Sequence, residues 1–114
     1  MLYNLSVVKK LGGDEDIFVR KLIYIFINSI IPELNQFNEA YENKDLKMLA
    51  IRAHSIKSNF DLFNVTSMKK TIRILENKDL LTTLDSKEIA SYVTEVNTTI
   101  HAVIAEMKQD YPPC

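Results

Sequence analysis

His54, Lys57 and Ser58 are the residues of this sequence whose types and spacing could carry out chemistry. A helix turns by about 100° per residue, so residues three and four positions after His54 share its face. A neutral imidazole is a good nucleophile near neutral pH, and Lys57 can place positive charge beside an anionic reactant. Ser58 is small and leaves the approach to His54 open. These residue types suit the transfer of a phosphoryl group to His54.

The helix that must carry these residues is predicted from a stripe of apolar side chains. The members of this stripe are Leu49, Ala53, Ile56, Phe60 and Phe63. His54 lies on the opposite side of the helix, so we expect it to face away from the core. Asp45 is expected to cap the start of the helix, and Asn64 suits the left-handed conformation that often follows a helix.

Four further residues around His54 are candidates for contact with a partner protein. Asp61 lies on the face of His54, and Ala50 lies behind the histidine on that face. Ile51 and Leu62 flank this face and cannot both belong to the apolar stripe, so we expect them to be partly exposed. Partly exposed apolar side chains beside a histidine are typical of a docking surface.

A chance pairing of histidine and lysine is the competing interpretation of this face, because most such pairs on helix surfaces are solvated and inert. No metal site is predicted. The only other histidine is His101, on a different predicted helix, and no histidine or cysteine stands at ligand spacing beside His54. His101 lies off the apolar stripe of its own helix and is predicted to be a surface residue.

Length and composition predict one cytoplasmic domain, spanning residues 1–114. Hydrophobic residues make up 46% of the chain and charged residues 25%, and only 2 glycines and 3 prolines interrupt it. A net charge of −1 does not predict binding to nucleic acid. The longest apolar run, over residues 22–31, is shorter than the ~20 residues that a membrane helix needs. A single cysteine, Cys114, fits a reducing compartment.

Five helices are predicted along the chain. Besides the helix of His54, they are a short one over residues 2–10, a long one from a cap at Asp14 to Tyr41, one over residues 66–76, and a last one that opens with a capping box at residues 85–88. Gly12 and Gly13 end the first helix. Pro32 is expected to kink or break the second. Within that helix, residues 22–27 are apolar all round and should be covered on more than one side.

The four longer helices predict an all-α fold. Their stripes and short connections are typical of an antiparallel up-down four-helix bundle, with the first helix as a short extra N-terminal element. The last helix has the clearest stripe, made of Ile89, Tyr92, Val93, Val96, Ile100, Val103, Ile104 and Met107. Residues 109–114 are expected to form a loose tail.

The sequence around His54 resembles the signature of histidine phosphotransfer (HPt) domains. Residues 53–58, Ala-His-Ser-Ile-Lys-Ser, are similar to the usual form Ala-His-x-Leu-Lys-Gly. The resemblance extends to residues 11–15, to Ile-Pro-Glu-Leu at residues 31–34 and to Ile-Leu-Glu at residues 74–76, so it covers nearly the whole chain in order. The family usually has glycine in place of Ser58 and Asn64. Serine is also small, and asparagine tolerates the same backbone geometry.

This resemblance implies a phosphorelay intermediate. In that family the motif histidine accepts a phosphoryl group from the aspartate of one receiver domain and passes it to another. Carried over, His54 is the phosphoacceptor, Lys57 stabilises the phosphate, and Ser58 gives access. The expected partners are response-regulator receiver domains and a hybrid sensor histidine kinase. The receiver would supply Mg²⁺, and this chain is expected to need no cofactor of its own.

We therefore expect a monomeric phosphocarrier and not a stand-alone enzyme, since the sequence has no glycine-rich loop or P-loop for ATP. Two alternatives remain open at this point. The chain could be a helical adaptor that uses the same face to bind a partner while His54 is never phosphorylated. It could also be an obligate dimer that buries residues 22–27 between subunits.

Overall fold

The structure is a computed structural model that describes residues 2–13 and 15–113. These residues form helices only, with no β-strand among them, so the all-α prediction is confirmed. In chain order the elements are α1 (Ser6–Gly12), α2 (Asp16–Glu42), α3 (Leu46–Leu62), the 3-10 turn η1 (Thr66–Met68), α4 (Lys69–Leu75), α5 (Lys78–Leu81) and α6 (Ser86–Asp110).

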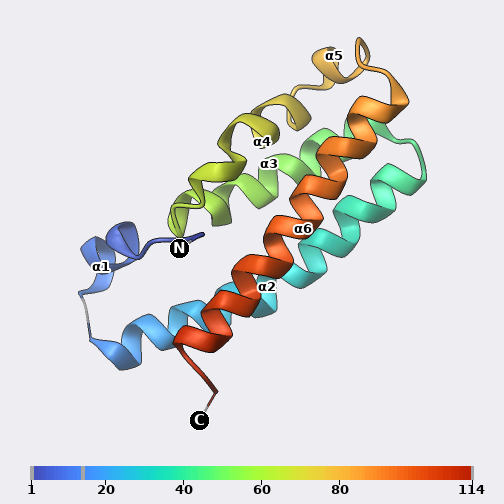
Figure 1. Ribbon diagram of the computed structural model, residues 1–114. Helices are drawn as coiled ribbons and strands as arrows, with labels where there is room; N and C mark the ends of the chain where they lie inside the picture. The colour runs from blue at the N-terminus through green and yellow to red at the C-terminus, as the bar shows by residue number, and fades with distance from the viewer. Residues whose placement is uncertain (1, 14, 114) are drawn as a thin grey trace.

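The two longest helices, α2 and α6, pack against each other and run in opposite directions (Figure 1). α3 returns along α2, and α4 packs against both α3 and α6. The short α5 contacts α3 and α4, while α1 packs against α2. As a result, α3 lies between α2 on one side and α4 with α5 on the other, and only its outer face remains open.

The core is made of the apolar stripes that the sequence predicts. Every stripe residue of the helix of His54 is buried, as is every member of the α6 stripe except the half-buried Tyr92. The face of α2 is buried at Phe26, Ile30, Leu34 and Phe37. Burial of these side chains is the main term that stabilises the helices, because an isolated helix of such length is marginal in water.

The run over residues 22–27 is covered less completely than its composition suggests. Ile23, Phe26 and Ile27 are buried, and the Phe26 ring lies 4.8 Å from that of Phe63 between centroids. Leu22 and Tyr24 are half-buried against the core, whereas Ile25 is exposed. The run is therefore covered on more than one side, as expected, but not at Ile25.

Local sequence signals correctly predict several helix ends. The Asp45 side chain accepts a hydrogen bond from the Met48 N–H at 3.1 Å, and the capping box of Asp85 with Glu88 is complete. Asn64 takes a positive φ of 54°. Its turn is closed by the Val65 N–H, which donates to the Phe60 carbonyl at 2.8 Å. The predicted cap at Asp14 lies outside the described residues.

Pro32 does not break α2, which continues from Asp16 to Glu42. Proline removes a single hydrogen bond, the one to the carbonyl four residues earlier at Asn28. Both Pro32 and Asn28 are exposed, so water can satisfy the freed carbonyl. The apolar stripe on the other side of the helix is undisturbed, which is why its phase persists across the proline.

Helical structure near the middle of the chain differs in detail from the prediction. The helix expected over residues 66–76 is present, but its first turn is the 3-10 turn η1. The stretch after it contains the extra short helix α5, which the Asn77 side chain caps by accepting from the Leu80 N–H at 3.1 Å. This helix was not predicted, because a single turn leaves no periodic pattern.

The described C-terminal residues up to Pro112 belong to α6 or contact α2. α6 extends to Asp110, and the Tyr111 carbonyl accepts a hydrogen bond from the Tyr24 hydroxyl at 2.8 Å. Arg20 donates to the Pro112 carbonyl and stacks its guanidinium over the Tyr111 ring, 5.6 Å from the centroid. These contacts connect residues 111 and 112 to α2, while the looseness of the tail over residues 109–114 stays a prediction.

An amide pair joins α2 to α6. Asn38 and Asn97 each donate a side-chain N–H to the carbonyl oxygen of the other at 2.8 Å. Both are half-buried, so a shift in register would leave their polar groups unpaired. This pair therefore helps to set the axial position of α2, against which α3 packs.

None of the helices in residues 2–13 and 15–113 combines the length and hydropathy needed to span a bilayer.

Candidate functional site

His54 lies in the middle of α3 and faces away from the core, as predicted. Its side chain is 72% exposed, but its ring is held on one edge. The Nδ1 atom lies 3.0 Å from Oε2 of Glu76, which follows the last residue of α4. The other carboxylate oxygen, Oε1, accepts a hydrogen bond from Lys57 Nζ at 3.2 Å. One carboxylate thus joins the histidine to the lysine.

The charge of Glu76 is favoured by these two contacts. Partial burial raises the pKa of Glu76, but the hydrogen bonds from His54 and Lys57 outweigh it and hold the pKa below its usual value. An ionised carboxylate can only accept hydrogen bonds. The proton between Glu76 and a neutral His54 therefore belongs to Nδ1, which leaves the lone pair on Nε2.

This arrangement gives the exposed side of the ring a defined chemistry. Nε2 is the unprotonated, nucleophilic nitrogen, and the Nδ1–H bond fixes the orientation of the ring. Lys57 adds a cation on the same face, with a side chain that is bonded to Glu76 and 42% exposed. The site can attack an electrophile that carries negative charge.

Glu76 is the functional residue that local sequence reasoning misses. It belongs to the Ile-Leu-Glu segment that carries part of the family resemblance, yet nothing in its own neighbourhood marks it as a partner of His54. The two residues are 22 positions apart and meet only because α4 packs against α3. Pairing of these helices in an antiparallel hairpin is the signal that could have found it.

A second carboxylate lies on the other flank of α3. Glu33 of α2 accepts a hydrogen bond from the Asn59 amide at 3.0 Å. Burial raises the pKa of Glu33, although the Asn59 hydrogen bond and the charge of Arg52 oppose this.

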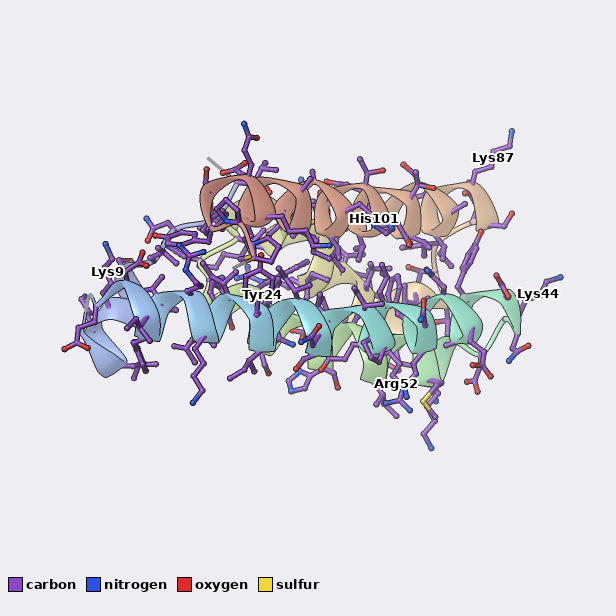
Figure 2. The ribbon with its side chains drawn as sticks, turned by 90° about the horizontal axis from the view of Figure 1, so that it is seen from below. Lys9, Tyr24, Lys44, Arg52, Lys87 and His101 are labelled. Carbon is purple, nitrogen blue, oxygen red and sulfur yellow. The ribbon has the colours of Figure 1, made fainter. Side chains whose placement is uncertain are left out.

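Figure 2 shows Arg52 on the far side of the molecule from α6, which carries His101. His101 is exposed, as predicted, and takes no part in the site.

The remaining predicted residues around His54 differ in how far they are exposed. Ser58 and Asp61 are exposed, and Ile51 is 46% exposed on the outer surface of α3. Leu62 is half-buried and packs partly against the core. The exposed apolar side chain of Ile51 and the smaller exposed part of Leu62 flank the histidine face, as the helical phase predicts.

Ala50 does not belong to this exposed surface. Its side chain is only 6% exposed and forms part of the core. The helical phase alone places Ala50 behind His54, but the elements packed against α3 leave it buried. The expectation that Ala50 contacts a partner is corrected accordingly, since its methyl group offers almost no surface.

Among the described residues, no group of three or more histidine, cysteine, aspartate or glutamate side chains is placed to hold a metal ion. Comparisons of the chain with models of protein families, with curated proteins and with solved structures found no match. The functional assignment therefore depends on the geometry around His54 and on the motif that surrounds it.

Proposed function

We propose that this protein is an HPt-like phosphorelay intermediate, in which His54 receives a phosphoryl group from the aspartate of one receiver domain and delivers it to another. The observation that supports this best is an exposed histidine whose Nδ1 is held by Glu76, while Lys57, on the same face of α3, bonds to the same carboxylate. An inert surface histidine has no need of a half-buried carboxylate that orients it.

The fold supports the same proposal. α2, α3, α4 and α6 each pack against two of the others, which supports a four-helix bundle with α1 as the extra N-terminal helix. η1 extends α4 at its N-terminal end. Such a bundle leaves the exposed face of α3 available for docking to a separate globular domain.

In the proposed reaction, the Nε2 lone pair of His54 attacks the phosphorus of the aspartyl phosphate in line with the bond that breaks. The N–P bond forms as the bond from phosphorus to the aspartyl oxygen breaks, and the receiver carboxylate leaves. Nδ1 keeps its proton throughout, because Glu76 holds it. Lys57 stabilises the charge on the phosphoryl oxygens, while Mg²⁺ on the receiver supplies the larger part of the stabilisation.

The receiver would dock on the outer surface of α3 and the adjoining part of α2. Ile51 supplies an exposed apolar contact, and the half-buried Leu62 adds to it. Asp61 gives this surface a negative charge at its edge, and Ser58 leaves room beside His54. The protein holds half of a reaction site and acts as a carrier, with response-regulator receivers and a hybrid sensor kinase as partners.

A phosphotransfer assay tests the proposal and distinguishes it from a helical adaptor. Receiver domains phosphorylated with labelled phosphate are mixed with the protein, and label on the protein is tested for acid lability and base stability. We expect such label on the wild type and on the His101→Gln control, and none on His54→Gln. Absence of label from the wild type with every receiver tried, or label that survives in His54→Gln, would refute the proposal.

A further inference from the structure

A pocket of about 350 Å³ lies on the α4 side of α3, and neither His54 nor Glu76 belongs to its lining. Its volume is at the lower end of the range found for small-molecule sites, which starts at about 300 Å³. The C-terminal half of α3, η1 and α4 line it. Lys57 belongs both to this pocket and to the hydrogen-bonded group of His54 and Glu76.

The floor of this pocket is apolar. Four buried side chains close it from below: Phe60, Val65, Met68 and Ile72. The long aliphatic stems of the lysine and arginine side chains at its rim extend this apolar surface upward, since such stems pack on apolar groups while the charged ends stay in water. An occupant therefore needs an apolar body.

The rim of the pocket is cationic. Lys57, Lys69 and Arg73 surround the opening, and Asp61 is the one acidic residue that lines it. Lys69 and Arg73 have no carboxylate within salt-bridge distance among residues 2–13 and 15–113. Their charges are therefore available to a ligand. In a chain whose net charge is −1, this rim is a local excess of positive charge.

We propose that this pocket binds a small organic anion with an apolar body and one negatively charged group. The apolar body lies on the floor, and the anionic group is stabilised by Lys69 and Arg73, with Lys57 as the third cation. Since Glu76 also binds Lys57, the ligand and Glu76 compete for the same ammonium group. The pocket does not depend on phosphorylation of His54, so its test and that of the proposed function can fail separately.

The experiment uses 2-naphthoate as the probe and the neutral 2-naphthamide as its matched analogue. Each is titrated into the labelled protein while backbone amide shifts are recorded by NMR. We expect saturable shifts confined to η1, α4 and the C-terminal half of α3, with naphthoate binding roughly fivefold or more tighter than naphthamide because of its charge. Scattered or non-saturating shifts at millimolar probe, or equal affinity for the two probes, would overturn the proposal.

Charge variants locate the binding determinants. Arg73→Glu and Lys69→Glu should each remove most of the preference for naphthoate, whereas Lys70→Glu, which makes the same charge change outside the pocket lining, should retain it. An equal loss in Lys70→Glu would show a mere effect of net charge and overturn the site. His54→Gln should bind naphthoate like the wild type.

The competition for Lys57 has its own test. In Glu76→Gln the carboxylate no longer holds the ammonium group, so naphthoate should bind roughly threefold tighter. The affinity for naphthamide should stay the same in this variant, which controls for changes in the shape of the pocket. Unchanged naphthoate affinity would show that Lys57 is not shared between the two sites.

Discussion

Two glutamates, one on each flank of α3, resemble each other in burial yet have opposite electrostatic behaviour. Glu76 on the α4 side meets an imidazole and an ammonium group, and its pKa is lowered. Glu33 on the α2 side meets a neutral amide, and its pKa is raised, because the Asn59 hydrogen bond and the more remote Arg52 do not offset its burial. Burial raises the pKa of both carboxylates, so the difference comes from the groups that each one meets.

This difference separates a reactive flank of α3 from a structural one. The carboxylate of Glu76 is ionised and bonded to a group with a free lone pair, so it can tune chemistry at His54. Glu33 is bonded to a side chain that does not titrate, so it can only help to hold α2 against α3. Changes on the α4 side should therefore alter transfer, and matched changes on the α2 side should alter stability alone.

Loss of Lys57 should have the largest effect on the rate of phosphoryl transfer. Lys57→Ala removes the cation that stabilises the phosphoryl oxygens, and because this side chain is partly exposed we expect transfer to His54 to slow by about tenfold. Asn59→Ala, on the opposite flank, should leave the rate unchanged. The measurement is the rate of transfer from a phosphorylated receiver under single-turnover conditions. An equal loss of rate in both variants would contradict the assignment.

A charge on the outer surface of α3 should weaken docking of the receiver, by a factor similar to or smaller than the loss of rate in Lys57→Ala. Ile51→Glu places a carboxylate in the proposed interface, and we expect receiver affinity to fall by roughly fivefold to tenfold. Ile17→Glu is the matched control, since Ile17 is also exposed but lies at the far N-terminal end of α2. Affinities measured by titration calorimetry should separate the two. Unaltered affinity in Ile51→Glu would place the interface elsewhere.

Removal of the charge of Glu76 should slow transfer less than removal of Lys57. Glu76→Gln can still occupy the space beside His54 but no longer favours a proton on Nδ1, so we expect a rate roughly threefold to fivefold lower. Glu33→Gln makes the same chemical change on the other flank and should transfer at the wild-type rate. A rate in Glu76→Gln equal to that of the wild type would show that the ring needs no orientation.

The smallest effect is the pH dependence of stability, in which the two glutamates should differ in sign. The lowered pKa of Glu76 contributes stability that is present above the unfolded pKa and is lost as pH falls through the folded pKa. The raised pKa of Glu33 means that its ionised form costs stability above the folded pKa, and that acid relieves this cost as pH falls through the folded pKa.

Urea unfolding of the two glutamine variants from neutral to acidic pH measures this difference. At neutral pH, Glu76→Gln should be less stable than the wild type by about 0.5 kcal/mol, as is usual for exposed ion pairs. Glu33→Gln should be at least as stable as the wild type there. Both differences should shrink in acid. Two variants that change stability in the same direction at neutral pH would contradict the contrast.

Features that depend on neighbours in the sequence could be predicted. Asp45 and Asp85 cap their helices through hydrogen bonds to residues three positions away. The residues that form each cap are therefore neighbours in the sequence. The exposure of His54 follows equally from its phase relative to a strongly apolar stripe. These predictions need only the geometry of a helix.

Features that depend on which helices meet could not be predicted in the same way. The partner of His54 is 22 residues distant, and the carbonyl of Tyr111 is held by a hydroxyl 87 residues away. Ala50 has the helical phase of an exposed residue but is buried in the folded chain. In each case the deciding contact comes from tertiary packing, which a helical wheel does not contain.

The identity of the phosphorylated nitrogen tests the central claim most directly. Protein labelled isotopically in nitrogen is phosphorylated by a receiver, and NMR correlations of the imidazole ring then report which nitrogen carries the phosphoryl group. Because Glu76 holds the proton on Nδ1, the phosphoryl group should be found on Nε2 of His54. A phosphoryl group on Nδ1, on His101, or on no histidine would contradict the account.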